Sequence, residues 1–255
     1  MITIGLDIGS VAAKGLLLTE DQQLTLLRPT GWSPRDAGAG LIQELLAAAG
    51  LNRGDVSRIV ATGYGRVAVT GVDKAVTEIT CHARGLIALL PQVRTVIDIG
   101  GQDSKVIKLN ERGRVIDFAM NDKCAAGTGR FLQVMAGTLG LDVSELAAAE
   151  RPGELVPITS MCTVFAESEL ISHLAQNRSK GGLVAGLHQS VAKRVASMAS
   201  KLGVVEPVAF TGGVALNDGV RRALAVEMRV ELLTPPERQF TGALGAAILA
   251  RELGE

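Results

Sequence analysis

The sequence predicts an α/β fold built from two similar halves. The run Ile4-Gly5-Leu6-Asp7-Ile8-Gly9 is followed by Lys14, and the run Val96-Ile97-Asp98-Ile99-Gly100 is followed by Lys105. Both copies read D-I-G-x4-K, with the lysine seven positions after the aspartate, and they lie 91 residues apart. Helix-like and strand-like patterns alternate between the copies. Together these observations indicate an internal duplication.

Each copy is typical of a β-hairpin, in which one strand ends near the aspartate and the next begins near the lysine. Glycine permits the tight turn between them. Backbone amides at such a turn can hold phosphate oxygens, and a carboxylate at a strand end can hold hydrated Mg²⁺. One D-I-G hairpin would be an ordinary turn. Two with the same spacing predict a pair of turns that clamp one nucleotide.

The other predicted elements follow from periodicity. Apolar residues at helical spacing predict a helix over 41–49, and residues 57–62 predict a strand. After the second copy, the pattern predicts helices near 131–139 and 170–174, a long core-packing helix over 184–202, a buried strand from 207 entering the Gly212-Gly213 turn, and a final helix from about 241 to 253.

The duplication divides the chain into two predicted lobes. Residues 1–92 form the first lobe and residues 93–255 the second, which carries the two cysteine-bearing helices discussed below. The C-terminal helix belongs to the second lobe in sequence but could pack on the first lobe.

Composition limits the class of protein. The chain of 255 residues is 47% hydrophobic and 20% charged, which is typical of a globular protein. Its 26 basic residues balance 26 acidic ones, which argues against nucleic-acid binding. No uncharged run exceeds roughly a dozen residues, which is too short to span a membrane, and the N-terminus lacks the basic flank of a signal peptide. We expect a cytoplasmic protein.

Two familiar nucleotide motifs can be set aside. Residues 63–68 match the loose G-x-G-x-x-A dinucleotide pattern, but no acidic residue follows at the required distance. The chain also contains no G-x4-G-K-[ST], the pattern of a P-loop. We therefore reject both a Rossmann site and a P-loop.

The three cysteines form an odd set in a reducing compartment, so we expect no structural disulfide. Cys124 and Cys162 are each predicted just ahead of a helix, where a thiolate is favoured as a metal ligand. Two chains would supply the four thiolates of a [4Fe–4S] cluster. On spacing alone, the alternative that these two cysteines are small buried hydrophobic residues is favoured. Cys81 could be a ligand with His82, but packing is the better interpretation.

These motifs together resemble a known family, the ATP-dependent iron–sulfur activators of 2-hydroxyacyl-CoA dehydratases (the BadF/BadG/BcrA/BcrD ATPase family). The resemblance covers nearly the whole chain. It is carried by residues 5–10 with Lys14, 61–66, 77–83, 98–105, 121–131, 161–165 and 210–215. It implies an acetate kinase, sugar kinase, Hsp70 and actin type of fold with ATP between two halves. It also implies a homodimer that holds one [4Fe–4S] cluster on Cys124 and Cys162.

The resemblance also implies roles for individual residues. Asp7 and Asp98 would orient Mg²⁺ and water, while Gln102 and Asp103 would position the attacking water. Gly212 and Gly213 would face the adenosine, and Asn217 would cap the following helix. The residues expected to hold phosphates are Gly9, Ser10, Lys14, Gly100, Gly101, Gln102 and Lys105, although Lys105 could instead be a surface lysine.

The implied activity is one-electron transfer, driven by ATP hydrolysis, from ferredoxin or flavodoxin to an iron–sulfur partner such as a 2-hydroxyacyl-CoA dehydratase. Close alternatives are the reduction of a double-cubane cluster protein and a subunit of benzoyl-CoA reductase. More distant alternatives are a small-molecule kinase such as a sugar kinase, and a nucleotide-responsive iron–sulfur sensor or scaffold.

Overall fold

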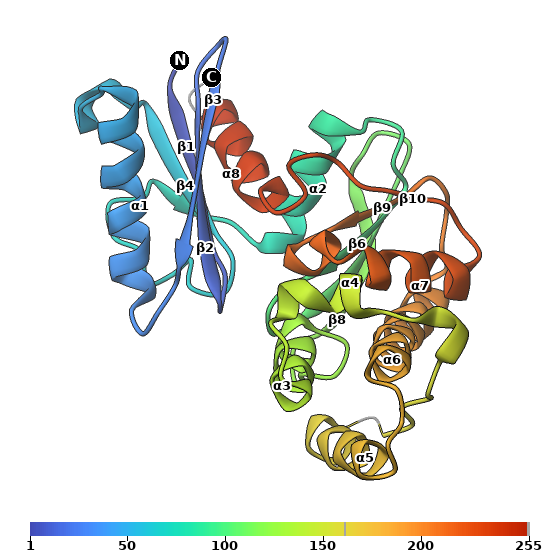
Figure 1. The fold of residues 1–255 in the computed structure, drawn as a ribbon. Coiled ribbons are helices and arrows are strands. Elements are labelled where there is room, and N and C mark those ends of the chain that lie inside the picture. The colour runs from blue at the N-terminus through green and yellow to red at the C-terminus, as the bar shows by residue number, and fades with distance from the viewer. Residues whose placement is uncertain (161, 254–255) are drawn as a thin grey trace. The chain divides into compact units, whose positions relative to one another are not determined.

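The computed structural model describes residues 1–160 and 162–253 and is shown in Figure 1. Met161, part of one motif quoted above, lies outside the described residues. The chain divides into two compact units. Unit 1 comprises Met1–Arg94, Leu109–Ile116 and Pro235–Glu255, and unit 2 comprises Thr95–Lys108 and Asp117–Thr234. Two segments, 109–116 and 235–255, therefore belong with the first unit rather than with a lobe made of residues 93–255.

Unit 1 is built on a five-stranded sheet in the order β3-β2-β1-β4-β5. The central strand β1 pairs antiparallel with β2 and parallel with β4, so the first D-I-G hairpin joins the two central antiparallel strands. The strands are β1 (Thr3–Ile8), β2 (Ala12–Leu18), β3 (Gln23–Pro29), β4 (Arg58–Thr62) and β5 (Lys74–Ala75).

Helices cover both faces of this sheet (Figure 1). On one face lies α1 (Pro34–Ala49), which begins at Ser33, whose hydroxyl accepts from the amide of Asp36, and ends at Gly50 in the left-handed conformation. On the other face lie α2 (Glu78–Leu89) and the C-terminal α8 (Thr241–Glu252). The predicted helices at 41–49 and 241–253 are therefore present, the first of them longer than predicted.

Alternation along β1 separates the two faces chemically. Ile4, Leu6 and Ile8 enter the core shared with α1. Gly5 faces α8 so closely that a Cβ would lie 2.0 Å from the carbonyl oxygen of Ala243. Asp7 lies two residues after Gly5 and therefore on the α8 face of the sheet.

Unit 2 repeats this plan with a sheet in the order β10-β9-β6-β7-β8. Strand β6 pairs antiparallel with β7 and parallel with β9, as β1 does with β2 and β4. The strands are β6 (Thr95–Ile99), β7 (Ser104–Leu109), β8 (Val115–Asn121), β9 (Val208–Thr211) and β10 (Leu232–Leu233).

The helices of unit 2 pack around one large core that includes Phe131, Leu187 and Phe210. As the apolar stripe predicts, the longest helix, α6, buries its apolar side in this core. Among the described helices, none is long and apolar enough to cross a membrane. The helices are α3 (Gly129–Leu139), α4 (Leu146–Ala149), α5 (Thr163–Ala175), α6 (Lys180–Leu202) and α7 (Asp218–Met228), with 3₁₀ turns η1 to η4 at Arg53–Asp55, Val143–Glu145, Pro152–Glu154 and Gly213–Leu216 across the two units.

Candidate functional site

The first D-I-G turn places a buried carboxylate beside an ammonium group. Asp7 stands opposite Lys14 in the β1–β2 register, and Lys14 Nζ lies 3.4 Å from Asp7 Oδ2. The amide of Gly9 donates to the carbonyl oxygen of Ala12 at 3.2 Å and closes the turn. Ser10, at the tip, is half-buried. The seven-residue spacing thus brings the two charges together across the hairpin.

The second turn repeats this arrangement. Asp98 stands opposite Lys105, whose Nζ lies 3.7 Å from Asp98 Oδ2 and 2.7 Å from Asp103 Oδ2. The amide of Gly100 donates to the carbonyl oxygen of Asp103 at 2.9 Å. Lys105 is only 3% exposed, so the alternative that it is a surface lysine is wrong. Its burial is possible because two carboxylates surround the ammonium group.

The exposed part of the second turn is Gln102, with Gly101 half-buried beside it. The carboxylate of Asp103 is already engaged with Lys105. Gln102 therefore offers a free-standing side-chain amide to a ligand at this turn, whereas Asp103 is fixed by its neighbour.

A third strand completes each site, and sequence reasoning missed it in unit 1. Asp7 pairs with Thr62 of β4, and Asp98 pairs with Thr211 of β9. Thr211 Oγ1 donates to Asp98 Oδ1 at 3.0 Å. Each threonine is the last residue of its strand and is followed by a glycine with positive φ. The two sites thus share an Asp, Lys, Thr-Gly arrangement.

Both glycines are required because the backbone lies against the carboxylate. A Cβ on Gly63 (φ +84°) would be 2.5 Å from Asp7 Oδ1, and one on Gly212 (φ +90°) would be 2.9 Å from Asp98 Oδ1. Gly63, the first residue of the segment rejected above as a dinucleotide fingerprint, is therefore part of the Asp7 site. The shared T-G at the ends of the two strands was the sequence feature that could have identified it.

The predicted double-glycine turn forms the 3₁₀ turn η4. Gly212 is buried, whereas Gly213 is exposed. Asn217 caps α7 as predicted, because its Oδ1 accepts from the amide of Val220 at 3.1 Å. Exposed backbone at Gly213 is the part of this turn that a ligand can reach.

The second turn is also tied to α3. The amide of Arg130, in the first turn of α3, donates to the carbonyl oxygen of Gly101 at 2.7 Å. Cys124 lies in the loop between β8 and this helix, five residues before α3 begins rather than just ahead of it. The loop is held by Asn121, whose Nδ2 donates to the carbonyl oxygens of Cys124 at 2.8 Å and Ala126 at 3.1 Å. Thr128, not Cys124, is the N-cap residue.

Cys162 is the N-cap residue of α5, as predicted, and it is exposed. Its carbonyl oxygen accepts from the amide of Ala166 at 2.8 Å, so the first turn of the helix is well formed. Cys162 is thus suited to bind an external metal, and Cys124, which is half-buried, is partly accessible.

Cys81 differs from both. It is fully buried in α2, and burial raises the pKa of its thiol to about 12. Its neighbour His82 places Nδ1 2.9 Å from Thr241 Oγ1. These environments agree with packing rather than metal binding at positions 81 and 82.

Across residues 1–160 and 162–253, no three His, Cys, Asp or Glu side chains gather as a metal site. The donor chemistry of Cys124 and Cys162 nevertheless fits an iron–sulfur cluster if a second chain supplies the remaining thiolates.

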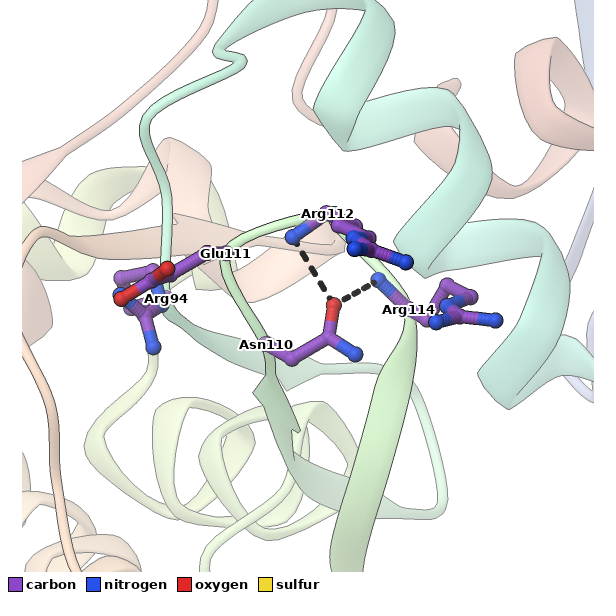
Figure 2. Close-up of a pocket in the computed structure, with 5 residues that line it drawn as sticks. All are labelled: Arg94, Asn110, Glu111, Arg112 and Arg114. Atoms are coloured by element: carbon purple, nitrogen blue, oxygen red, sulfur yellow. Dashed lines mark hydrogen bonds and ion pairs between the residues drawn. The ribbon is translucent and has the colours of Figure 1, made fainter.

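One further pocket lies at the β7–β8 turn in unit 1 and is shown in Figure 2. It has a volume of about 430 Å³. Asn110 shapes it by accepting from the amides of Arg112 and Arg114, each at 3.0 Å. None of the predicted site residues lies in it. It is lined by Arg94, Asn110, Glu111, Arg112 and Arg114.

Solved structures establish the class of fold. The structure of (R)-2-hydroxyglutaryl-CoA dehydratase component A from Acidaminococcus fermentans matches with a TM-score of 0.94 at 45% identity, covering 100% of this chain and 99% of that one. A Streptomyces griseus glucokinase of the ROK family matches with a TM-score of 0.56 at 17% identity, over 99% of this chain and 100% of that one. The fold is the duplicated α/β ATPase fold of acetate kinase, sugar kinases, Hsp70 and actin.

Sequence comparison narrows this class to one family. The 2-hydroxyisocaproyl-CoA dehydratase activator of Clostridioides difficile is 48% identical over 252 residues, which are 98% of this chain and 95% of the relative. A solved structure of that activator, with bound ADPNP, has a TM-score of 0.92 and covers 100% of this chain and 96% of that one. A family model matches residues 4–250. The chain therefore belongs to the BadF/BadG/BcrA/BcrD ATPase family.

Proposed function

We propose that the protein is an ATP-hydrolysing activator that passes one electron to an iron–sulfur partner, in the first instance a 2-hydroxyacyl-CoA dehydratase. The observation that carries the proposal is the bond from Arg130 to Gly101. It ties the turn expected to bind phosphate to the helix that follows Cys124. A nucleotide-dependent change at the turn therefore has a direct route to the loop of that cysteine.

The two Asp-Lys turns would act on one MgATP. Asp7 and Asp98 are buried carboxylates at strand ends, suited to orient hydrated Mg²⁺ and the attacking water. The backbone amides and lysines of the turns would hold the phosphates, and exposed Gln102 would position water. Asp103 acts by fixing Lys105. The phosphate-binding residues would be Gly9, Ser10, Lys14, Gly100, Gly101 and Lys105, with Gly212, Gly213 and Asn217 on the adenosine side.

Cys124 and Cys162 would hold the redox group. Two copies of the chain in a homodimer would together supply four thiolates, the ligand number of a [4Fe–4S] cluster. When bound, the cluster would supply a one-electron carrier, loaded by ferredoxin or flavodoxin. In this chain the Asn121 loop and the start of α5 fix the backbone at these two cysteines.

Hydrolysis is needed because the transfer is uphill. Raising the energy of one electron by about 300 mV costs about 7 kcal/mol. The nucleotide can change the surroundings of the cysteines only if ATP and ADP make different contacts with the turns. A sugar kinase needs no exposed cysteine at a helix start, so the glucokinase likeness in fold does not favour that activity.

The test is anaerobic stopped-flow mixing of reduced protein with the 2-hydroxyacyl-CoA dehydratase of the same organism. Transfer is expected with MgATP and not with MgADP or without nucleotide. The control is Asp98→Asn, which should retain iron but give no ATP-dependent transfer. Equal rates in all three nucleotide conditions would leave the ATPase and the cysteines unconnected and would favour a sensor or scaffold.

A further inference from the structure

A buried polar chain crosses unit 2 beside the η4 turn. His188 of α6 is 0% exposed and lies between two partners. Its Nδ1 is 2.8 Å from Glu150 Oε1, and its Nε2 is 3.1 Å from Nδ2 of Asn217. Glu150 also receives a hydrogen bond from Arg222 of α7. None of these contacts is part of the phosphate-binding turns.

The donors and acceptors fix the orientation of every group. The Oδ1 of Asn217 already accepts from the amide of Val220, so its Nδ2 faces His188 and can only donate. Nε2 of His188 must accept, which leaves its proton on Nδ1, directed at Glu150. The directions of the pKa shifts agree with a neutral His188 beside an ionised Glu150. Burial lowers the pKa of His188, and although burial acts to raise the pKa of Glu150, its bonds to His188 and Arg222 lower it.

Asn217 joins the η4 turn to α7. Its backbone N–H donates to the carbonyl oxygen of Val214 at 2.9 Å, while its side chain caps the helix. If the side-chain amide turned over, its oxygen would face the acceptor Nε2 of His188 and its NH₂ would face the amide of Val220. Both contacts would then be repulsive. His188 therefore selects the orientation of the Asn217 side chain that caps α7, and it anchors the residue whose backbone N–H closes the turn.

The η4 turn in turn lies against the Asp98 site. A Cβ on Gly212 would be 2.4 Å from the carbonyl oxygen of Ile99. Val214 Cγ2 lies 3.3 Å from the Cβ position of Gly129, at the start of α3. Gly212 and Val214 therefore place the turn in close contact with the Asp98 site and with the start of α3.

We propose that His188 is a positioning residue for nucleotide binding. By fixing the amide of Asn217, it holds the η4 turn in the shape that receives the nucleotide. The inference rests on the proposed function, since it takes Gly213 and its neighbours as part of the ATP site. His188 itself does not contact the nucleotide.

Two substitutions test the contacts of the two ring nitrogens of His188 separately. The Nδ2 of asparagine falls near the position of histidine Nδ1, so His188→Asn keeps the donor to Glu150 but loses the acceptor for Asn217. The Oε1 of glutamine can reach the position of Nε2, so His188→Gln keeps the acceptor and loses the contact with Glu150. A merely structural role for His188 would make the two variants similar.

The experiment measures ATP dissociation constants by calorimetry, together with kcat and KM for hydrolysis. His188→Asn is expected to raise Kd and KM about five-fold, the effect of one ordinary hydrogen bond, with kcat within two-fold of wild type. His188→Gln should remain within two-fold of wild type in all three. Arg221→Ala, which removes an exposed ion pair on α7, the helix that Asn217 caps, is the control and should also change none of them.

Asn217→Ser provides a second route if His188→Asn folds poorly. The serine hydroxyl can still cap α7 but is too short to reach His188, so this variant should raise Kd by a similar factor. Combined with His188→Asn, the effects should be less than additive. Equal Kd values in His188→Asn, His188→Gln and wild type would overturn the inference, as would equal losses in both variants. Wild type that binds and hydrolyses ATP without reducing a dehydratase would overturn the proposed electron transfer and leave this inference standing.

Discussion

Gly129 donates its backbone N–H to the carbonyl oxygen of Gly100 at 2.9 Å, so the first residue of α3 is attached to the turn that follows Asp98. The approach is close enough that a Cβ on Gly129 would lie 3.1 Å from that oxygen. Together with the bond from Arg130 to Gly101, it makes the helix start and the turn one hydrogen-bonded unit. The loop of Cys124 leads directly into it.

Replacing either turn aspartate should strongly reduce ATP hydrolysis. Asp7→Asn and Asp98→Asn each remove a buried charge while keeping the shape of the side chain. We expect turnover to fall about 100-fold or more in each, as for other well-placed electrostatic groups. Steady-state phosphate release measures this, with exposed Asp117→Asn as the control that should keep full activity. Unchanged turnover in either turn variant would mean that the two turns do not act on one nucleotide.

The cysteines should differ in their effect on iron content. After anaerobic reconstitution, Cys124→Ala and Cys162→Ala should lose the cluster, because each would remove two of the four ligands of a shared site. Cys81→Ala should keep it, because that thiol is buried and its pKa is raised to about 12. Iron and sulfide analysis with the visible spectrum measures the outcome. Full iron in either of the first two variants would contradict the assignment.

The crossing of α2 and α8 should be intolerant of a methyl group. A Cβ on Gly85 would lie 2.0 Å from the carbonyl oxygen of Thr241, so Gly85→Ala must push the helices apart. We expect it to lower the free energy of unfolding by about 1–3 kcal/mol. Gly137→Ala, also in a helix but with nothing within 4 Å, should raise it by about 0.5–1 kcal/mol. Urea unfolding followed by circular dichroism compares them, and equal changes would refute the close crossing.

Acid should weaken the segment that leads to Cys162. Burial acts to raise the pKa of Glu169, but hydrogen bonds from Thr159 and Ser160 outweigh it and lower that pKa to about 2. A folded-state pKa below the unfolded value of 4.5 stabilises the fold at higher pH, and this contribution is lost as the pH falls from about 4.5 towards 2.

The matching variant is Glu169→Gln, which cannot titrate. It should be less stable than wild type at pH 7, and the difference should shrink between pH 5 and pH 2. Urea unfolding at several pH values measures the free energy of unfolding of both proteins. The other carboxylates titrate in both, so their contributions cancel in the difference. A constant difference across this range would show that Glu169 has an ordinary pKa.

The sequence by itself determined the features that depend on local spacing. In a hairpin the register follows from the turn, and the two copies have turns of equal length, so the lysine seven residues after the aspartate faces it in both. The cap at Asn217 and the helix start at Cys162 are likewise local, because a cap and the amide it serves are only a few residues apart.

Only the tertiary structure decided which distant segments complete each site. Thr62-Gly63 and Thr211-Gly212 reach Asp7 and Asp98 through parallel pairing across long stretches of chain, and no local pattern specifies that pairing. The burial of Lys105 and the contact between His188 and Asn217 arise in the same way. Packing within each unit brings these groups together, and the buried Lys105 and His188 are satisfied there by partners that their own strand or helix does not supply.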